Sequence, residues 1–230
     1  MENLFLKYMG DRMEHFSARH AKMGPVITIS RESGCPGNEL AEMLKTKLNL
    51  KREKEGMPPI WKWVNKEILM KASEELKMSP ADVATFVKER GSGLLEDLVS
   101  SFSESYYVRN ARIKKVVFDV IRNMTMEGHV IAVGRGSGII AWEIPNSLHL
   151  YLEAPLSWKS NMVSQYKGIS LPEARKYVLA RDIQRLKFRN SFRTKFSDEI
   201  YYDVRFNCKS FSVDEISQMV MHMAEQRKLI

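Results

Sequence analysis

The sequence predicts an α/β fold in which helices flank a five-stranded, mostly parallel sheet. Five short strand-like runs alternate with helical patterns along the chain, as they do when helical crossovers join parallel strands. The run 130–133 is apolar throughout, which is typical of a strand buried on both faces. Polar or glycine-containing stretches directly follow several of the runs. In such a sheet the carboxyl ends of the strands form the ligand site.

The size and composition of the chain favour one globular domain. Its 230 residues are enough for a sizeable core, and 44% of them are hydrophobic and 28% charged. No run approaches the ~20 apolar residues that span a bilayer, so we expect no membrane partner. Residues 1–23 lack the continuous apolar core of a secretory signal. Cys35 and Cys208 are far apart, so we expect a cytoplasmic protein without a disulfide framework or a metal cage.

The net charge of the chain bears on its partners. A value of +8, from 36 basic and 28 acidic residues, favours nucleotides, phosphorylated metabolites or nucleic acid. A basic soluble protein without an anionic partner is the alternative. We do not expect nucleic-acid binding, because no basic stretch with interleaved aromatic residues and no recognised module is present. A nucleotide or another small phosphorylated ligand is therefore the favoured partner.

The chain begins with apolar residues at near-helical spacing. We expect residues 1–23 to form an amphipathic helix that docks on the domain spanning 24–230. Docking on a partner, such as a second copy in an oligomer, is the alternative. The residues that make the pattern are Leu4, Phe5, Tyr8, Met9, Met13 and Phe16.

The remaining strands and helices can be assigned to residue ranges along the chain. Strands are predicted over 26–30, 60–64, 130–133, 147–152 and 202–207. The main helices are predicted over 39–50, 107–127, 155–167, 171–190 and from 213 onward. Capping boxes at Ser170 and Ser212, each with Glu three residues later, mark the start of the last two helices. Residues 51–59 and 191–200 are expected to be connectors.

Residues 65–105 are predicted to be mainly helical, and they lie between two predicted strands. Ser79-Pro80 and Gly91-Ser92-Gly93 interrupt this stretch. Because it follows the second strand directly, we expect either a flap that closes on a substrate or peripheral packing.

The first strand leads into a candidate anion site. Gly34, Pro36 and Gly37 follow the strand, and a helical pattern begins at Asn38. Loop amides and the first turn of a helix together make a site for phosphate. The phosphate-loop pattern G-x-x-x-x-G-K-[ST] is not matched, because Arg31, Gly37 and Asn38 stand in place of its first Gly, its Lys and its hydroxyl residue. A plain strand-to-helix turn therefore remains the alternative.

Arginines form two further candidate sites. Gly134-Arg135-Gly136 follows the apolar third strand, so a ligand can approach the backbone closely while Arg135 offers a planar fork to phosphate oxygens. Arg181, Arg185 and Arg189 share one helix face, and such a row repels itself unless an anion is bound. A surface turn and a solvated basic face are the respective alternatives. The histidines are scattered, so no metal ligand is assigned.

Five stretches, taken in order, match one family pattern. They are 27–39 (ITISRESGCPGNE), 65–67 (NKE), 133–137 (VGRGS), Asp182 with Arg185, and 202–207 (YDVRFN). In this order they resemble I-S-R-E-x-G-S-G-G-x-E, D-K-E, V-G-R-G, D-x-R-R and Y-D-L-x-x-N-T of the cytidylate kinase-like family. That family is a branch of the nucleoside monophosphate kinases within the P-loop fold. The resemblance covers roughly residues 25–225.

This resemblance implies a fold, a reaction and a set of site residues. The fold has a monophosphate-binding helical flap over 65–105 and a lid region over 181–200. The reaction transfers the γ-phosphate of ATP to CMP or dCMP with Mg²⁺. The donor phosphates would lie on Ser33, Gly34, Cys35, Gly37 and Asn38. The phosphate-binding charge would come from Arg31, Arg135 or the lid, because the family branch lacks the phosphate-loop lysine. The acceptor end would contain Gly134, Arg135 and Arg112, and the lid would contribute Arg181, Asp182, Arg185 and Arg189.

Departures from the family pattern support an alternative function. Pro36 replaces a glycine and removes one N–H donor from the loop. The phosphate-loop Lys and the hydroxyl ligand of Mg²⁺ are missing, Asn65 replaces an Asp, and Ser137-Gly138 replaces the D-x-G-T of true cytidylate kinases. The alternative is a catalytically impaired nucleotide-binding or sensing module of the same fold.

Overall fold

The computed structural model describes residues 24–65, 70–71, 74–75, 77, 104–192 and 201–230. The predicted N-terminal helix, most of the predicted flap and the end of the predicted lid region lie outside the described residues. Helix α6 (Glu104–Glu127) contains Arg112, but its first ten side chains also lie outside them.

A parallel sheet of five strands forms the centre of the described fold, which confirms the predicted fold class. The strand order is β2-β3-β1-β4-β5. All four neighbouring pairs run parallel, and Ile29 on the central strand lies between Val133 and Leu150. The strands are β1 (Val26–Arg31), β2 (Lys62–Val64), β3 (Val130–Val133), β4 (Ser147–Glu153) and β5 (Val204–Asn207).

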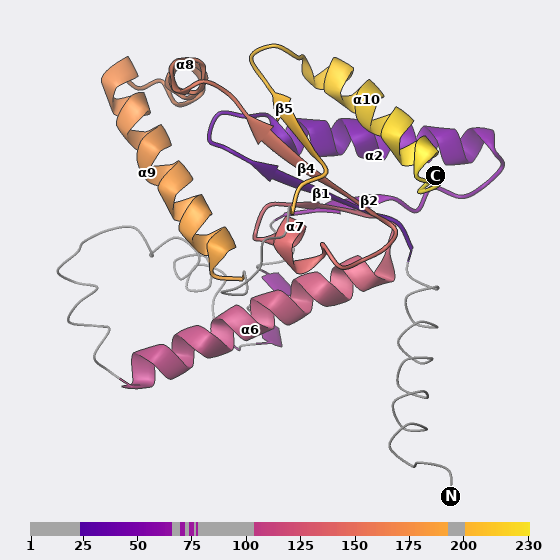
Figure 1. The fold of residues 1–230 in the computed structure, drawn as a ribbon, viewed down its shortest axis with the longest axis horizontal. Coiled ribbons are helices and arrows are strands. Elements are labelled where there is room, and N and C mark those ends of the chain that lie inside the picture. Colours follow the sequence, from indigo (N-terminus) through magenta and orange to yellow (C-terminus); the bar gives the residue numbers. More distant parts are fainter. Residues whose placement is uncertain (1–23, 66–69, 72–73, 76, 78–103, 193–200) are drawn as a thin grey trace, which may run out of the picture.

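Helices cover both faces of the sheet (Figure 1). Helices α2 (Gly37–Lys54) and α10 (Val213–Gln226) cover one face, and leucines of α2 are buried there against Ile216 and Val220 of α10. Helix α6 covers the opposite face with Val117, Val120 and Ile121. Burial of these apolar stripes is the main force that fixes the layers.

Helices α8 (Leu156–Lys167) and α9 (Leu171–Asn190) lie beyond the carboxyl ends of the strands (Figure 1). The connection between them is short, and Gly168 adopts a left-handed conformation there. At the start of α9 the Glu173 carboxylate accepts a hydrogen bond from the Ser170 N–H, as the capping-box pattern predicted. Helix α9 therefore stands where ligands bind in sheets of this kind.

Some predicted boundaries differ from the structure. Helix α2 continues through residues predicted as a connector, because Lys51, Arg52 and Lys54 suit the negative end of the helix dipole. The stretch between β3 and β4, to which no element was assigned from the sequence, contains a short helix, α7 (Ser137–Ile140). Its glycines masked the helical turn in the sequence. Strands β2 and β5 are shorter than predicted at their first residues.

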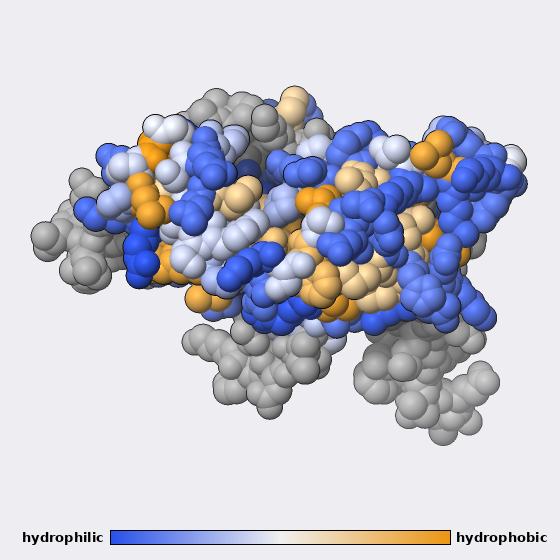
Figure 2. Space-filling view, turned by 90° about the horizontal axis from the view of Figure 1, so that it is seen from above, coloured by the Kyte–Doolittle hydropathy of each residue, from blue (hydrophilic) through white to orange (hydrophobic). Residues whose placement is uncertain are grey.

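The surface seen over α2 and α10 is largely hydrophilic, with small hydrophobic patches between charged side chains (Figure 2). None of the helices within the described ranges has the length and apolar character that a membrane span requires.

Candidate functional site

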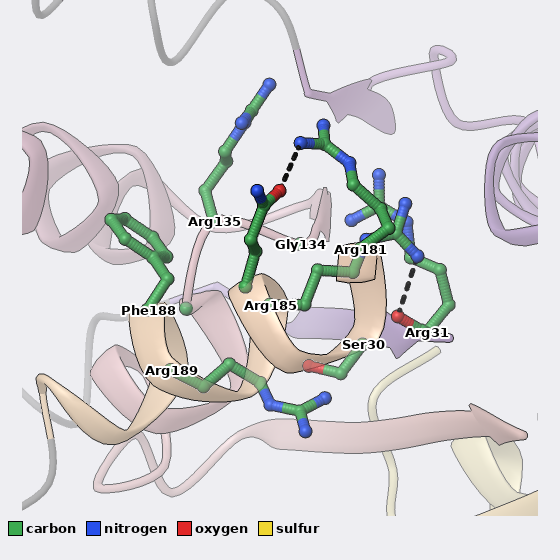
Figure 3. Close-up of a pocket in the computed structure, with 10 residues that line it drawn as sticks. Ser30, Arg31, Gly134, Arg135, Arg181, Arg185, Phe188 and Arg189 are labelled. Carbon is green, nitrogen blue, oxygen red and sulfur yellow. Dashed lines mark hydrogen bonds between the residues drawn. The ribbon is translucent and has the colours of Figure 1, made fainter. Parts of the chain in front are cut away.

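A pocket lined largely by arginines opens at the carboxyl ends of β1 and β3 (Figure 3). Strand β1 supplies Ser30 and Arg31, and the turn after β3 supplies Arg135 between its two glycines. Helix α9 contributes Arg181, Gln184, Arg185, Phe188 and Arg189. The structure thus brings together the three arginine-bearing elements that the sequence singled out. This arginine pocket has a volume of about 70 Å³.

None of the arginines of this pocket forms an ion pair with a carboxylate within the part of the chain that the structure describes. The ion pairs of arginine that are found there involve Arg205 and Arg227, which lie outside the pocket. Burial and then the charges of Arg185 and Arg135 lower the pKa of Arg31 to about 9. Burial and the charge of Arg181 lower the pKa of Arg135 to about 10. Guanidinium groups in this situation favour a bound anion.

The side chain of Arg31 runs from β1 across the site. A Cβ atom placed on Gly37 would lie 3.2 Å from both Cγ and Cδ of Arg31. A Cβ atom placed on Gly134 would lie only 1.6 Å from the Nη1 atom of Arg31. Helix α9 meets the same residue, since Nη1 of Arg185 donates a hydrogen bond to the Arg31 carbonyl oxygen over 3.1 Å. Arg31 therefore lies between the phosphate-loop region, the turn after β3 and α9.

Backbone strain accompanies the position of Arg135. Gly134, Arg135 and Gly136 have φ angles of +72°, +58° and +79°. A left-handed conformation costs a non-glycine residue roughly 1–2 kcal/mol. The Nε atom of Arg135 is also buried without a hydrogen-bond partner in the structure. Backbone strain and unsatisfied buried donors are both found at functional sites more often than elsewhere in proteins.

The phosphate-loop region offers fewer free amides than the sequence predicted. The Ser33 N–H donates to Oδ1 of Asp182 over 2.7 Å, and the Cys35 N–H donates to the Glu32 carbonyl oxygen over 3.3 Å. The Gly37 N–H donates to the Cys35 carbonyl oxygen over 2.9 Å. Three amides of the expected anion site therefore donate hydrogen bonds within the protein. The positive charge of the site lies mainly on guanidinium groups.

Asp182 was predicted to bind phosphate, but its carboxylate is engaged by the protein itself. Besides the Ser33 amide, it accepts a hydrogen bond from Nζ of Lys159 over 2.7 Å. Lys159 also pairs with Glu32 over 2.8 Å. This ion triad of Glu32, Lys159 and Asp182 ties the loop after β1 to α8 and α9. Sequence reasoning missed Lys159, because nothing in the local pattern distinguishes it from other lysines.

A second, larger pocket adjoins the arginine pocket and shares Arg31 and Arg185 with it. Residues 33–39 form one side, so the pocket contains Ser33, Gly34, Cys35, Gly37 and Asn38 of the predicted donor site. Tyr166 and Lys167 of α8 and Tyr177 of α9 form another side. Its volume of about 440 Å³ lies in the range of small-molecule sites.

Two further predicted residues occupy defined positions. The Arg189 guanidinium lies 4.8 Å from the ring centroid of Tyr151 and 6.0 Å from that of Tyr202, so it stacks on aromatic rings while lining the arginine pocket. Asn65 at the end of β2 donates from Nδ2 to Oδ1 of Asn38 over 3.0 Å. This bond uses the Asn38 oxygen at the position where a phosphate loop has its metal-binding hydroxyl.

Comparisons with known proteins agree with this fold. The model of the cytidylate kinase-like family matches residues 26–210. A cytidylate kinase from Pyrococcus horikoshii is 29% identical over 96 residues, which are 41% of this chain and 48% of that enzyme. The matched part thus spans about half the length of this curated relative. Because the family model matches a continuous range of residues, the evidence for this family does not depend on the individual motifs alone.

One solved structure has the same overall arrangement, and a second was also compared. An uncharacterized protein from Eubacterium ventriosum superposes with a TM-score of 0.58 at 21% identity, covering 88% of this chain and 98% of that one. A shikimate kinase from Bacteroides thetaiotaomicron gives a TM-score of 0.47 at 14% identity, covering 87% and 98%. The first of these similarities supports the fold.

Proposed function

Because the chain belongs to the cytidylate kinase-like family, we propose that it transfers the γ-phosphate of ATP to CMP, dCMP or a similar small acceptor. One observation carries the proposal most strongly. Five arginines line a single pocket at the carboxyl ends of the strands, and no carboxylate of the described residues pairs with them. A site with so much unpaired positive charge suits the joined phosphates of a donor and an acceptor.

The arrangement of the two pockets supports a division of roles. The larger pocket, with residues 33–38, would hold the donor nucleotide, and Arg135 would lie at the acceptor end. Arg31 and Arg185 line both pockets, so their guanidinium groups would lie near the phosphate that moves. They would stabilise the charge on its oxygens during in-line transfer, and no covalent intermediate with the protein is needed.

The described residues do not fit a dedicated Mg²⁺ site. The Asn38 oxygen is bonded to Asn65, and the Asp182 carboxylate is bonded to Lys159 and Ser33. Mg²⁺ often binds through substrate phosphates and water with only one or two protein carboxylates. We therefore propose that any Mg²⁺ arrives with ATP, and the roles given to the arginines do not depend on it.

A non-catalytic nucleotide-binding module is the second candidate. The pairing of the Ser33 amide with Asp182 favours it, because a phosphate loop normally offers such amides to the nucleotide. Pro36 provides no N–H donor at all. Such a module would bind a nucleotide without turning it over.

A coupled assay of ADP release tests the proposed function. Each nucleoside and deoxynucleoside monophosphate would be offered with millimolar ATP and Mg²⁺. We expect turnover with at least one acceptor, and a loss of roughly 10²–10³-fold in kcat/KM for Arg185→Ala. Arg175→Ala is the matched control, because Arg175 is exposed on the same helix and lines neither pocket.

The two candidates differ in the assay. Absence of turnover with every acceptor, combined with thermal stabilisation by ATP, would favour the non-catalytic module. Absence of both would remove nucleotide binding from the proposal.

A further inference from the structure

The side chain of Arg31 lies against the position from which a phosphate-loop lysine would project. In the pattern G-x-x-x-x-G-K-[ST] that lysine would stand at Gly37, the first residue of α2. The three atoms nearest to a Cβ placed on Gly37 all belong to Arg31: Cγ and Cδ at 3.2 Å and Nε at 3.5 Å. The stem of Arg31 therefore covers Gly37, and a larger residue there would have to displace it.

The guanidinium group of Arg31 needs a second glycine. Any side chain at Gly134 would collide with its Nη1 and Cζ atoms. Gly134 also has a φ of +72°, so a non-glycine residue would be strained there as well. The two glycines thus leave a channel in which the side chain of Arg31 lies.

The guanidinium group of Arg31 lies where the two pockets adjoin, and a donor phosphate would bind at this place. It lines the arginine pocket with Arg135 and also lines the larger pocket with residues 33–39. No carboxylate of the described ranges forms an ion pair with it. A largely enclosed cation next to other cations is stabilised when an anion enters.

We propose that Arg31 contacts the donor phosphates in place of the missing lysine, and that residues 37 and 134 are glycine because the Arg31 side chain crosses them. The cation would therefore come from the last residue of β1 and not from the first residue of α2, where a phosphate loop has its lysine. This inference rests on the proposed function, because it assumes that a nucleoside triphosphate binds at residues 33–38.

Transfer of the cation back to position 37 tests the proposal. The probes are ATP and AMP, with dissociation constants measured by calorimetry on the full chain. The variants are Arg31→Ala, Gly37→Lys and the double variant Arg31→Ala/Gly37→Lys. Arg175→Ala is the control. The φ of Gly37 is not in the left-handed region, so lysine can be accommodated there once the Arg31 stem is gone.

We expect Arg31→Ala to weaken ATP binding by roughly 10- to 100-fold, the range for loss of a charged hydrogen bond. AMP binding should change less than threefold, because AMP lacks the β- and γ-phosphates. The double variant should recover at least about tenfold of the loss. Gly37→Lys alone should bind ATP more weakly than wild type, because its stem and that of Arg31 compete for the same space.

Several outcomes would overturn the proposal. They are unchanged ATP binding in Arg31→Ala, equal loss of ATP and AMP affinity, and no recovery in the double variant. The melting temperature without ligand checks that each variant is folded. Wild-type protein that binds no ATP would instead refute the proposed function, so the two failures are distinguishable.

Discussion

Replacement of Lys159 by Met should destabilise the protein strongly. Lys159 pairs with Glu32 over 2.8 Å and with Asp182 over 2.7 Å. Its side chain is only 9% exposed, and those of the two acids are 24% and 19% exposed. Met has a similar length and no charge, so the substitution removes the cation and leaves two mostly buried carboxylates without it.

The size of the effect follows from this burial. Removal of one partner from a buried ion pair costs about 3–5 kcal/mol. We expect the lower value, about 3 kcal/mol, because Asp182 keeps its bond to the Ser33 amide and both acids keep some contact with solvent. For a chain of this size, 1 kcal/mol shifts the melting temperature by about 2–4 °C. The expected decrease is therefore roughly 6–12 °C.

Differential scanning calorimetry of Lys159→Met and Lys62→Met provides the measurement and its control. Lys62 pairs with Glu127 over 2.9 Å, but its side chain is 51% exposed. Exposed pairs contribute about 0–1 kcal/mol, so Lys62→Met should lower the melting temperature by no more than about 4 °C. Equal shifts for both variants would show that the buried triad adds nothing beyond a surface pair.

Three further predictions concern other parts of the structure. Burial lowers the pKa of His149 to about 4, so the unfolded chain binds a proton that the folded chain excludes. The contribution of the neutral His149 imidazole to the free energy of unfolding is fully present above pH 6.5 and is lost as the pH falls toward 4. Between pH 7 and pH 5, urea titrations should show a loss of about 2 kcal/mol that His149→Gln does not show; equal slopes would contradict this assignment. A hydrogen bond with Cys208 and burial raise the pKa of the Cys35 thiol. Iodoacetamide should therefore label Cys35 at least about tenfold faster in Cys208→Ala at pH 8, as peptide mass spectrometry would measure, whereas equal rates would exclude the contact as the cause. The Ser212 hydroxyl caps α10, so Ser212→Ala should lower the free energy of unfolding by about 1 kcal/mol. A thermal melt indistinguishable from wild type would show that the cap contributes nothing.

The sheet was predictable because its strands are unambiguous in hydrophobic pattern. Ile27, Ile29, Val130 and Leu148 lie in β-prone or apolar runs and are fully buried. Strong local preference and tertiary burial agree at these positions, so no knowledge of distant contacts is required. The capping boxes were predictable for the same reason, since their hydrogen bonds connect residues three apart.

The details of the site depend on contacts between distant residues. The Ser33 amide meets Asp182 across 149 positions, and the Lys159 ammonium meets Glu32 across 127. No local pattern encodes these pairs. The direction of the Arg31 side chain likewise depends on Gly134, which lies in the turn after the neighbouring strand β3. The arginines could therefore be identified from the sequence, but the groups that accept hydrogen bonds from the loop amides could not.

The paired amides and the unpaired arginines are two sides of one arrangement. A phosphate loop built on backbone amides binds anions with neutral N–H donors. These donors repel one another little when no anion is bound. Here the amides of Ser33 and Gly37 donate hydrogen bonds within the protein, and the pocket is lined by guanidinium groups with five donors each. Such groups repel one another, and this repulsion adds to burial in lowering the pKa of Arg31 and Arg135. The ligand-free site is therefore the unfavourable state. The ion triad that holds α9 against the loop keeps the cluster together, and an anion in the pocket would relieve the repulsion that the triad opposes.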